Sequence, residues 1–110
     1  MNNDLAHTPE PPYFAVIFTS RRAIGDAGYS AMSERMQELA SQQPGFLGVE
    51  SVRGADGVGI TVSYWSSLES VRAWKAVSEH RTAQELGRSQ WYEDYRVRVC
   101  RVEREYGLDS

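Results

Sequence analysis

The fold is decided by residues 60–104, which read ITVSYWSSLESVRAWKAVSEHRTAQELGRSQWYEDYRVRVCRVER. A strand-like run ends at Tyr64-Trp65, the pair Ser66-Ser67 interrupts it, and helical sequence follows. All three tryptophans of the chain lie in this stretch, together with one of its two histidines. Each indole carries an N–H group that needs a partner when it is buried. The cluster therefore predicts either a demanding core or an aromatic-walled ligand cavity.

Composition limits the class of protein. The 110 residues, 41% of them apolar, are enough for one domain with a core, and a second subunit could complete it. The net charge of −3 and the lack of any run of Lys or Arg argue against binding to nucleic acid or to an anionic membrane. No apolar run is long enough to span a bilayer, and Met1–Pro12 lacks the features of a signal peptide. With Cys100 as the single cysteine, we expect a cytoplasmic protein without disulfides or a thiolate metal site.

Hydrophobic periodicity predicts alternating strands and helices. Tyr13–Ser20 is almost continuously apolar, which is typical of a strand at the centre of a sheet. A helix is expected between the N-cap Asp26 and the stop at Pro44-Gly45, and Ser66 with Glu69 predicts a capping box for the next helix. The expected strands are Tyr13–Ser20, Phe46–Arg53, Val58–Trp65 and Tyr95–Glu105, and the expected helical segments are Ala27–Gln43, one from Leu68 and a separate one from Ser78.

This order predicts an α+β fold, the ferredoxin-like β-α-β-β-α-β arrangement, with an antiparallel sheet covered by helices on one face. Residues 54–57, with a glycine at each end, suit a tight hairpin between the second and third strands. We expect a flexible N-terminal arm over residues 1–12, the domain over 13–106 and a short tail over 107–110. Because the other face of the sheet also needs a cover, we expect a homodimer built through that face.

The candidate site lies on the helical sequence after the third strand. At helical spacing His80, Gln84, Gly87 and Trp91 share a face, and a polar group beside an aromatic wall suits a small-molecule site. The ring of His80 could act as a general base, as a ligand to iron or as a hydrogen-bonded structural residue, whereas His7 is expected to be solvated. Gly87 inside a helix indicates a close packing contact. The candidate substrate-binding residues are Trp65, Trp74, Gln84, Trp91 and Tyr92, of which Trp65 and Trp74 also suit a core.

The segments Thr61-Val62-Ser63-Tyr64-Trp65-Ser66-Ser67-Leu68-Glu69, Arg72-Ala73-Trp74, His80-Arg81-Thr82-Ala83-Gln84 and Gly87-Arg88-Ser89-Gln90-Trp91-Tyr92 resemble the antibiotic biosynthesis monooxygenase family, in an uncharacterised bacterial branch. The resemblance covers nearly all of residues 13–106. It implies a dimeric α+β barrel, in which two ferredoxin-like sheets pack face to face and each subunit keeps a cavity between its sheet and its helices.

The same resemblance bears on cofactors, because some members of the superfamily oxidise polycyclic phenols with O₂ and no cofactor while others open haem. The haem-degrading members imply an axial histidine, a nearby tryptophan and an asparagine on the first strand. His80 and Trp74 match the first two, but Tyr13–Ser20 contains no asparagine. No cofactor and no metal are therefore expected, and haem degradation is the less favoured reaction.

The sequence thus predicts a cofactor-independent monooxygenase that acts on a small aromatic or conjugated substrate. In this hypothesis His80 takes the phenol proton, and Trp65, Trp74 and Trp91 form the walls. The alternative is a non-catalytic small-molecule-binding or stress-linked dimer with a vestigial cavity. A cavity too small for a bicyclic ligand, or one filled by Trp74 and Trp91, would favour that alternative.

Overall fold

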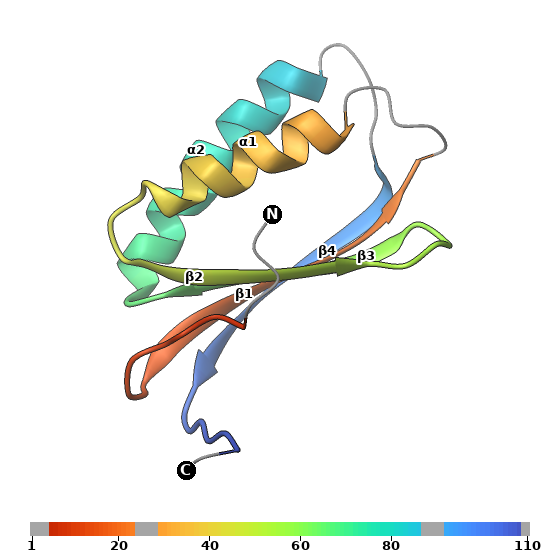
Figure 1. Ribbon diagram of the computed structural model, residues 1–110. Coiled ribbons are helices and arrows are strands. Elements are labelled where there is room, and N and C mark those ends of the chain that lie inside the picture. Colours follow the sequence, from red (N-terminus) through yellow and green to blue (C-terminus); the bar gives the residue numbers. More distant parts are fainter. Residues whose placement is uncertain (1–4, 24–28, 87–91, 109–110) are drawn as a thin grey trace.

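Helices cover one face of an antiparallel sheet, as Figure 1 shows. The computed structural model describes residues 5–23, 29–86 and 92–108. The predicted β-α-β-β-α-β order is confirmed. The elements are β1 (Tyr13–Arg22), α1 (Tyr29–Ser41), β2 (Phe46–Arg53), β3 (Val58–Trp65), α2 (Leu68–Leu86) and β4 (Tyr92–Val102).

The strand order β2-β3-β1-β4 places β1 in the centre, as its continuous apolarity predicts. β2 and β3 form the expected hairpin, in which Gly54 donates its N–H to the carbonyl of Val58 over 2.8 Å. Gly57 closes this turn at a φ of 91°, a conformation that side chains with a Cβ rarely adopt. The sheet is therefore fixed by local turn chemistry on one side and by long-range pairing of β1 on the other.

Strand alternation divides the sheet into two chemically different faces. Phe14, Val16 and Phe18 on β1 share the helix-covered face with Trp65, which pairs with Phe14. The core on this face consists of Trp65, Ala40 and Val71, packed against Phe14, Val16, Phe46 and Trp74. We call the other side, which carries Tyr13, Ala15, Ile17, Val62 and Tyr64, the open face. The helices pack on β2, β3 and β1, whereas the principal contacts of β4 are with β1.

The third helical segment expected from Ser78 does not exist as a separate helix. α2 runs without interruption through Ser78, whose hydroxyl donates to the carbonyl of Lys75 over 3.1 Å. This bond satisfies the serine side chain within the helix, so it does not need to start a new one. Trp74 and His80 consequently lie on one continuous helix.

The capping prediction was wrong by one residue. The hydroxyl of Ser67 accepts the backbone N–H of Ser70 over 3.0 Å and so caps α2. Ser66 instead donates its backbone N–H to the carbonyl of Gly45 over 2.8 Å, which ties the start of α2 to the turn after α1. Gly45 adopts a φ of 84° in that turn. The predicted N-cap Asp26 and the predicted contact residue Gly87 lie outside the described residues.

The described part of the N-terminal arm, residues 5–12, is docked on the open face. The N–H of Ala6 donates to Glu50 over 3.0 Å, and the Thr8 hydroxyl lies 3.0 Å from the Tyr13 hydroxyl. A Cβ added to Gly48 would come within 2.9 Å of the Ala6 side chain, so the arm lies directly on β2. Among the residues that the structure describes, no helix is long and apolar enough to cross a membrane.

Candidate functional site

Trp65 is a core residue in this structure. Its side chain is fully buried, and its indole N–H donates to the hydroxyl of Ser63 over 2.9 Å. The ring of Trp74 stacks on it with centroids 5.8 Å apart and an interplanar angle of 21°, while Phe46 meets it edge-on at 5.5 Å. Ser63 lies two positions away on β3, and side chains at that spacing share a face, so the strand itself supplies the partner for the indole.

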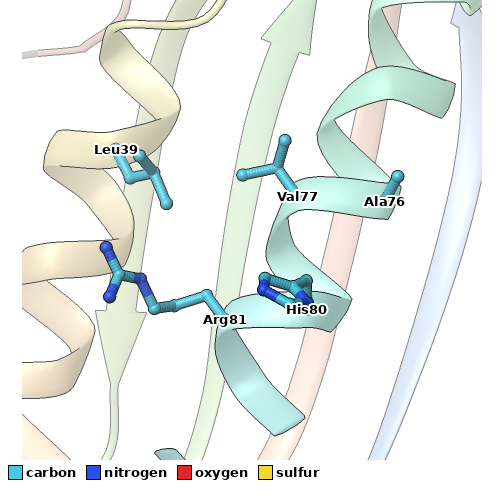
Figure 2. Close-up of a pocket in the computed structure, with 5 residues that line it drawn as sticks. All are labelled: Leu39, Ala76, Val77, His80 and Arg81. Carbon is cyan, nitrogen blue, oxygen red and sulfur yellow. The ribbon is translucent and has the colours of Figure 1, made fainter. Parts of the chain in front are cut away.

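His80 lies on α2, in an open groove between the two helices. Leu39 from α1 and Ala76, Val77, His80 and Arg81 from α2 line this groove, whose volume is about 450 Å³. Figure 2 shows Leu39 and Val77 at the space between the helices, with Arg81 extending from α2 towards α1. The His80 imidazole is exposed and belongs to the outer part of α2, whereas the core residues Val71 and Trp74 point inwards. A ligand at His80 would therefore meet the groove, not the buried Trp65.

A second aromatic group lies on the helix-covered face, where β1 meets the start of β4. Phe18 contacts Tyr92 edge-on at 5.3 Å and Tyr95 at 5.5 Å, and Tyr92 also packs with Met36 against the buried Met32 of α1. The neighbouring β4 side chains Val97 and Val99, which pair with Phe18 and Val16, remain about half exposed. This apolar surface offers ring faces and edges on which a conjugated molecule could stack.

The sequence prediction named Tyr92 as a substrate-binding residue but did not name Phe18, which contacts it. Phe14, Val16 and Phe18 alternate along β1, and this alternation was the available signal that Phe18 shares the helix-covered face. Its pairing with Val97 of β4 depends on a register that local patterns do not reveal. Tyr92 was expected before the last strand, which was predicted to begin at Tyr95, and it is instead the first residue of β4.

The open face carries a polar cluster that the sequence did not indicate. Tyr64 donates its hydroxyl to Glu50 over 2.6 Å, and Tyr13 and Thr8 donate theirs to Glu105. The two tyrosine rings meet edge-on at 5.9 Å. Each phenol thus keeps its proton beside a carboxylate. The same two carboxylates hold the N-terminal arm, because Glu50 accepts the N–H of Ala6 and Glu105 accepts the hydroxyl of Thr8.

Titration properties follow from this geometry. Burial raises the pKa of the Tyr64 phenol well above its usual value of 10.0, and the hydrogen bond to Glu50 raises it further. Burial and the hydrogen bond to Glu105 raise the pKa of Tyr13 in the same way. The hydrogen bonds from Thr8 and Tyr13 lower the pKa of Glu105. These tyrosines are therefore hydrogen-bond donors at neutral pH and not proton acceptors.

The remaining predicted site residues are placed only in part. Gln84 belongs to α2, but its side chain lies outside what the structure describes, as does all of Trp91. The structure therefore brings Trp65 and Trp74 together and keeps His80 in a separate groove. Among the described residues, no group of three or more His, Cys, Asp or Glu side chains is placed to hold a metal ion. Cys100 is a free, exposed thiol on β4.

Comparison with known proteins finds two relatives that differ in sequence identity to this chain. The protein YqjZ of Bacillus subtilis (strain 168), which is uncharacterized, is 57% identical over 105 residues, covering 96% of this chain and 92% of YqjZ. Jasmonate monooxygenase ABM of Pyricularia oryzae is 30% identical over 94 residues, covering 81% of this chain and 43% of its own length. The chain thus spans less than half of that second relative.

Solved structures share the fold at low sequence identity. A variant of SnoaB, a cofactor-independent oxygenase from Streptomyces nogalater, superposes with a TM-score of 0.70 and 14% identity, covering 91% of this chain and 100% of that chain. PA3566 from Pseudomonas aeruginosa gives a TM-score of 0.65 and 13% identity, covering 89% and 99%. The family model described as antibiotic biosynthesis monooxygenase matches residues 27–86, more than half of the sequence. By this match the chain belongs to the antibiotic biosynthesis monooxygenase family.

Proposed function

We propose that the protein is a cofactor-independent monooxygenase that acts on a small aromatic or conjugated substrate. The observation that carries this proposal is membership of the antibiotic biosynthesis monooxygenase family, through the match over residues 27–86. Two relatives support it by name: a jasmonate monooxygenase at 30% identity and, at the level of the fold, a cofactor-independent oxygenase. The cluster of Phe18, Tyr92 and Tyr95 supports an aromatic or conjugated substrate, because it offers ring faces and edges for stacking.

The chemistry for a phenol is balanced without a cofactor. The phenol gives up its hydroxyl proton, O₂ adds to the electron-rich ring, one oxygen atom stays in the quinone product and the other leaves as water. The two hydrogen atoms in that water come from the substrate, so no external reductant is consumed. The protein needs to supply a base and an apolar surface that holds the phenolate next to O₂.

In this proposal His80 is the base and the groove lined by Leu39, Val77 and Arg81 holds the phenol end of the substrate. A neutral imidazole nitrogen can accept the hydroxyl proton of a phenol, which is the role of a general base. Arg81 adds a cation that would favour the phenolate over the phenol. Trp74, Gln84, Trp91 and Tyr92 keep their proposed roles in substrate binding, while the full burial of Trp65 fits a supporting role behind Trp74.

The test is oxygen uptake by the purified protein with a panel of mono-, bi- and tricyclic phenols. We expect O₂ consumption with at least one phenol, and a loss of roughly 10²–10⁴-fold in rate for His80→Ala. His7→Ala is the matched control, because His7 lies in the arm, and it should retain the parent rate. If the parent protein takes up no O₂ with any phenol, the proposal fails. Titration with haem and flavin, followed by absorbance, tests the cofactor-free reading.

The stacking of Trp74 on the buried Trp65 favours a second candidate, a non-catalytic small-molecule binder. These rings occupy space between helix and sheet that a ligand would otherwise use. A protein of this kind would bind a phenol, seen as quenching of tryptophan fluorescence, without oxygen uptake. The same panel therefore separates the two functions.

We also propose that the protein is a cytoplasmic homodimer that packs through the open face. Support comes from exposed apolar side chains on that face: Val52 is 71% exposed and Ile60 is 42% exposed, next to the half-buried Ile17 and Val62. An apolar patch of this kind on a small subunit is typical of an interface. A two-fold axis lets one such patch cover itself.

A further inference from the structure

One row of side chains crosses the open face from edge to edge. Antiparallel register places Glu50 of β2 beside Val62 of β3, Val62 beside Ile17 of β1, and Ile17 beside Arg98 of β4. The row therefore begins with a carboxylate, continues through two apolar side chains and ends with a guanidinium. The open face is therefore acidic at the β2 edge of this row and basic at its β4 edge.

Among the residues that the structure describes, neither charge at the ends of this row has an ion-pair partner. Glu50 accepts hydrogen bonds from the Tyr64 hydroxyl at 2.6 Å and from the Ala6 N–H at 3.0 Å, and both donors are neutral. Two carboxylate oxygens provide about four acceptor sites, so Glu50 can accept further bonds. Arg98 is exposed, and no carboxylate of the described residues forms an ion pair with it.

In a two-fold symmetric dimer, the opposite charges at the two ends of the row can face each other across the interface. Two sheets that pack face to face in the aligned manner keep their strands within about 30° of each other. When the two-fold axis runs between the sheets along the strands, β4 of one subunit lies over β2 of the other. The row of one subunit then lies opposite the same row of its partner, running in the reverse direction. The basic end of each row faces the acidic end of the other, and the two apolar centres face each other.

Building on the proposed homodimer, we propose that Arg98 forms an ion pair with Glu50 of the partner subunit, twice in each dimer, across a two-fold axis that runs along the strands. A planar guanidinium can bond a carboxylate through two parallel N–H groups, and Arg is favoured at such interfaces. Ile17 and Val62 fill the space between the two pairs. Because Glu50 also holds Ala6, the same carboxylate joins the N-terminal arm to the interface.

The inference predicts a charge-reversal rescue, measured by sedimentation velocity over a range of protein concentrations. Arg98→Glu and Glu50→Arg should each raise the dimer dissociation constant at least ~10-fold, because each places like charges opposite one another at two symmetric positions. The double variant, which exchanges the charges, should bring the constant back towards that of the parent. Arg101→Glu is the matched control: Arg101 is on the same strand but on the helix side, where it pairs with Glu103 at 3.3 Å. It should dimerise like the parent.

Several results would overturn the pairing. If Arg98→Glu dimerises as tightly as Arg101→Glu, Arg98 does not form the pair. The pairing is also refuted if the double variant dimerises no more tightly than the weaker of the two single variants. Circular dichroism confirms that each variant is folded, so loss of the fold is not mistaken for loss of the interface. A monomeric parent would refute the proposed homodimer itself, whereas the oxygen-uptake assay tests the proposed reaction independently of either result.

Discussion

The phenol of Tyr64 shows what one buried hydrogen bond implies for stability. Its pKa is raised by burial first and by the bond to Glu50 second, so the folded protein keeps a proton that the unfolded chain releases above pH 10.0. This contribution to stability is complete below that pH and is lost as the pH rises above it. We therefore expect the free energy of unfolding, measured with urea, to decrease steeply above pH 10.0.

Tyr64→Phe provides the comparison for this prediction. Without the titrating phenol, the decrease above pH 10.0 should be shallower, with the remaining slope due in part to Tyr13, whose pKa is also raised. The variant should be less stable than the parent at neutral pH, because Glu50 loses a hydrogen bond. Identical slopes in the two proteins would show that the Tyr64 proton is not held by the fold.

Single residues also mark where sequence reasoning reached its limit in the candidate site. The choice between core and cavity for Trp65 depended on its indole partner, which is Ser63 on the same strand. The spacing of two positions was visible in the sequence, but the burial that makes the bond important depends on Ala40 of α1 and Val71 of α2, which lie on other elements. His80 was correctly placed in a helix, yet its direction relative to α1 follows from helix packing, which no local pattern contains.

The start of α2 gives a prediction about a secondary-structure element. The Ser67 side chain accepts the N–H of Ser70, whereas Ser66 contributes through its backbone. Ser67→Ala should therefore reduce the free energy of unfolding by ~1 kcal/mol, the usual cost of losing an N-cap. Ser66→Ala, measured in the same urea titration, should change it much less. The reverse order of effects would restore the capping box first predicted for Ser66 and Glu69.

Elements were predicted more reliably than their ends. β2 and β3 have the predicted bounds, because Gly54 and Gly57 define the turn between them. The break assumed at Ser78 was wrong, since a serine can bond to the carbonyl three residues before it and remain in the helix. β4 begins at Tyr92, earlier than the valine–arginine alternation indicated, because its first residues pair with Arg21 and Arg22 of an extended β1.

For the whole molecule, the proposed homodimer makes stability depend on protein concentration. Association stabilises the folded state by mass action, so each tenfold rise in concentration should raise the Tm by about 3 °C for a dimer of this size. Ile60→Asp, on the open face, should weaken this dependence because it places a carboxylate in the interface. Val97→Asp changes a side chain of similar exposure on the opposite side of the sheet and should leave it intact. A Tm independent of concentration would contradict the dimer.

The fold as a whole was accessible from the sequence because periodicity, turns and element order all indicated the same arrangement. The contacts that hold the N-terminal arm were not, since Ala6 bonds to Glu50 and Thr8 bonds to Glu105 near the other end of the chain. Contacts across nearly the whole chain length carry no local signature. The polar cluster on the open face could not be predicted for the same reason, because its hydrogen bonds join residues that are far apart in the sequence.

The position of β4 at the margin of the sheet bears on how the protein avoids self-association into fibres. β4 pairs with β1 on one side, and no described strand pairs with its other side, which leaves backbone groups able to recruit a further chain. Its arginines, Arg96, Arg98 and Arg101, interrupt the valines at short intervals. Stacking copies of this strand in register would place each guanidinium against its equivalent, so their repulsion opposes cross-β growth. We therefore expect the charges that make β4 polar to oppose amyloid-like polymerisation as well.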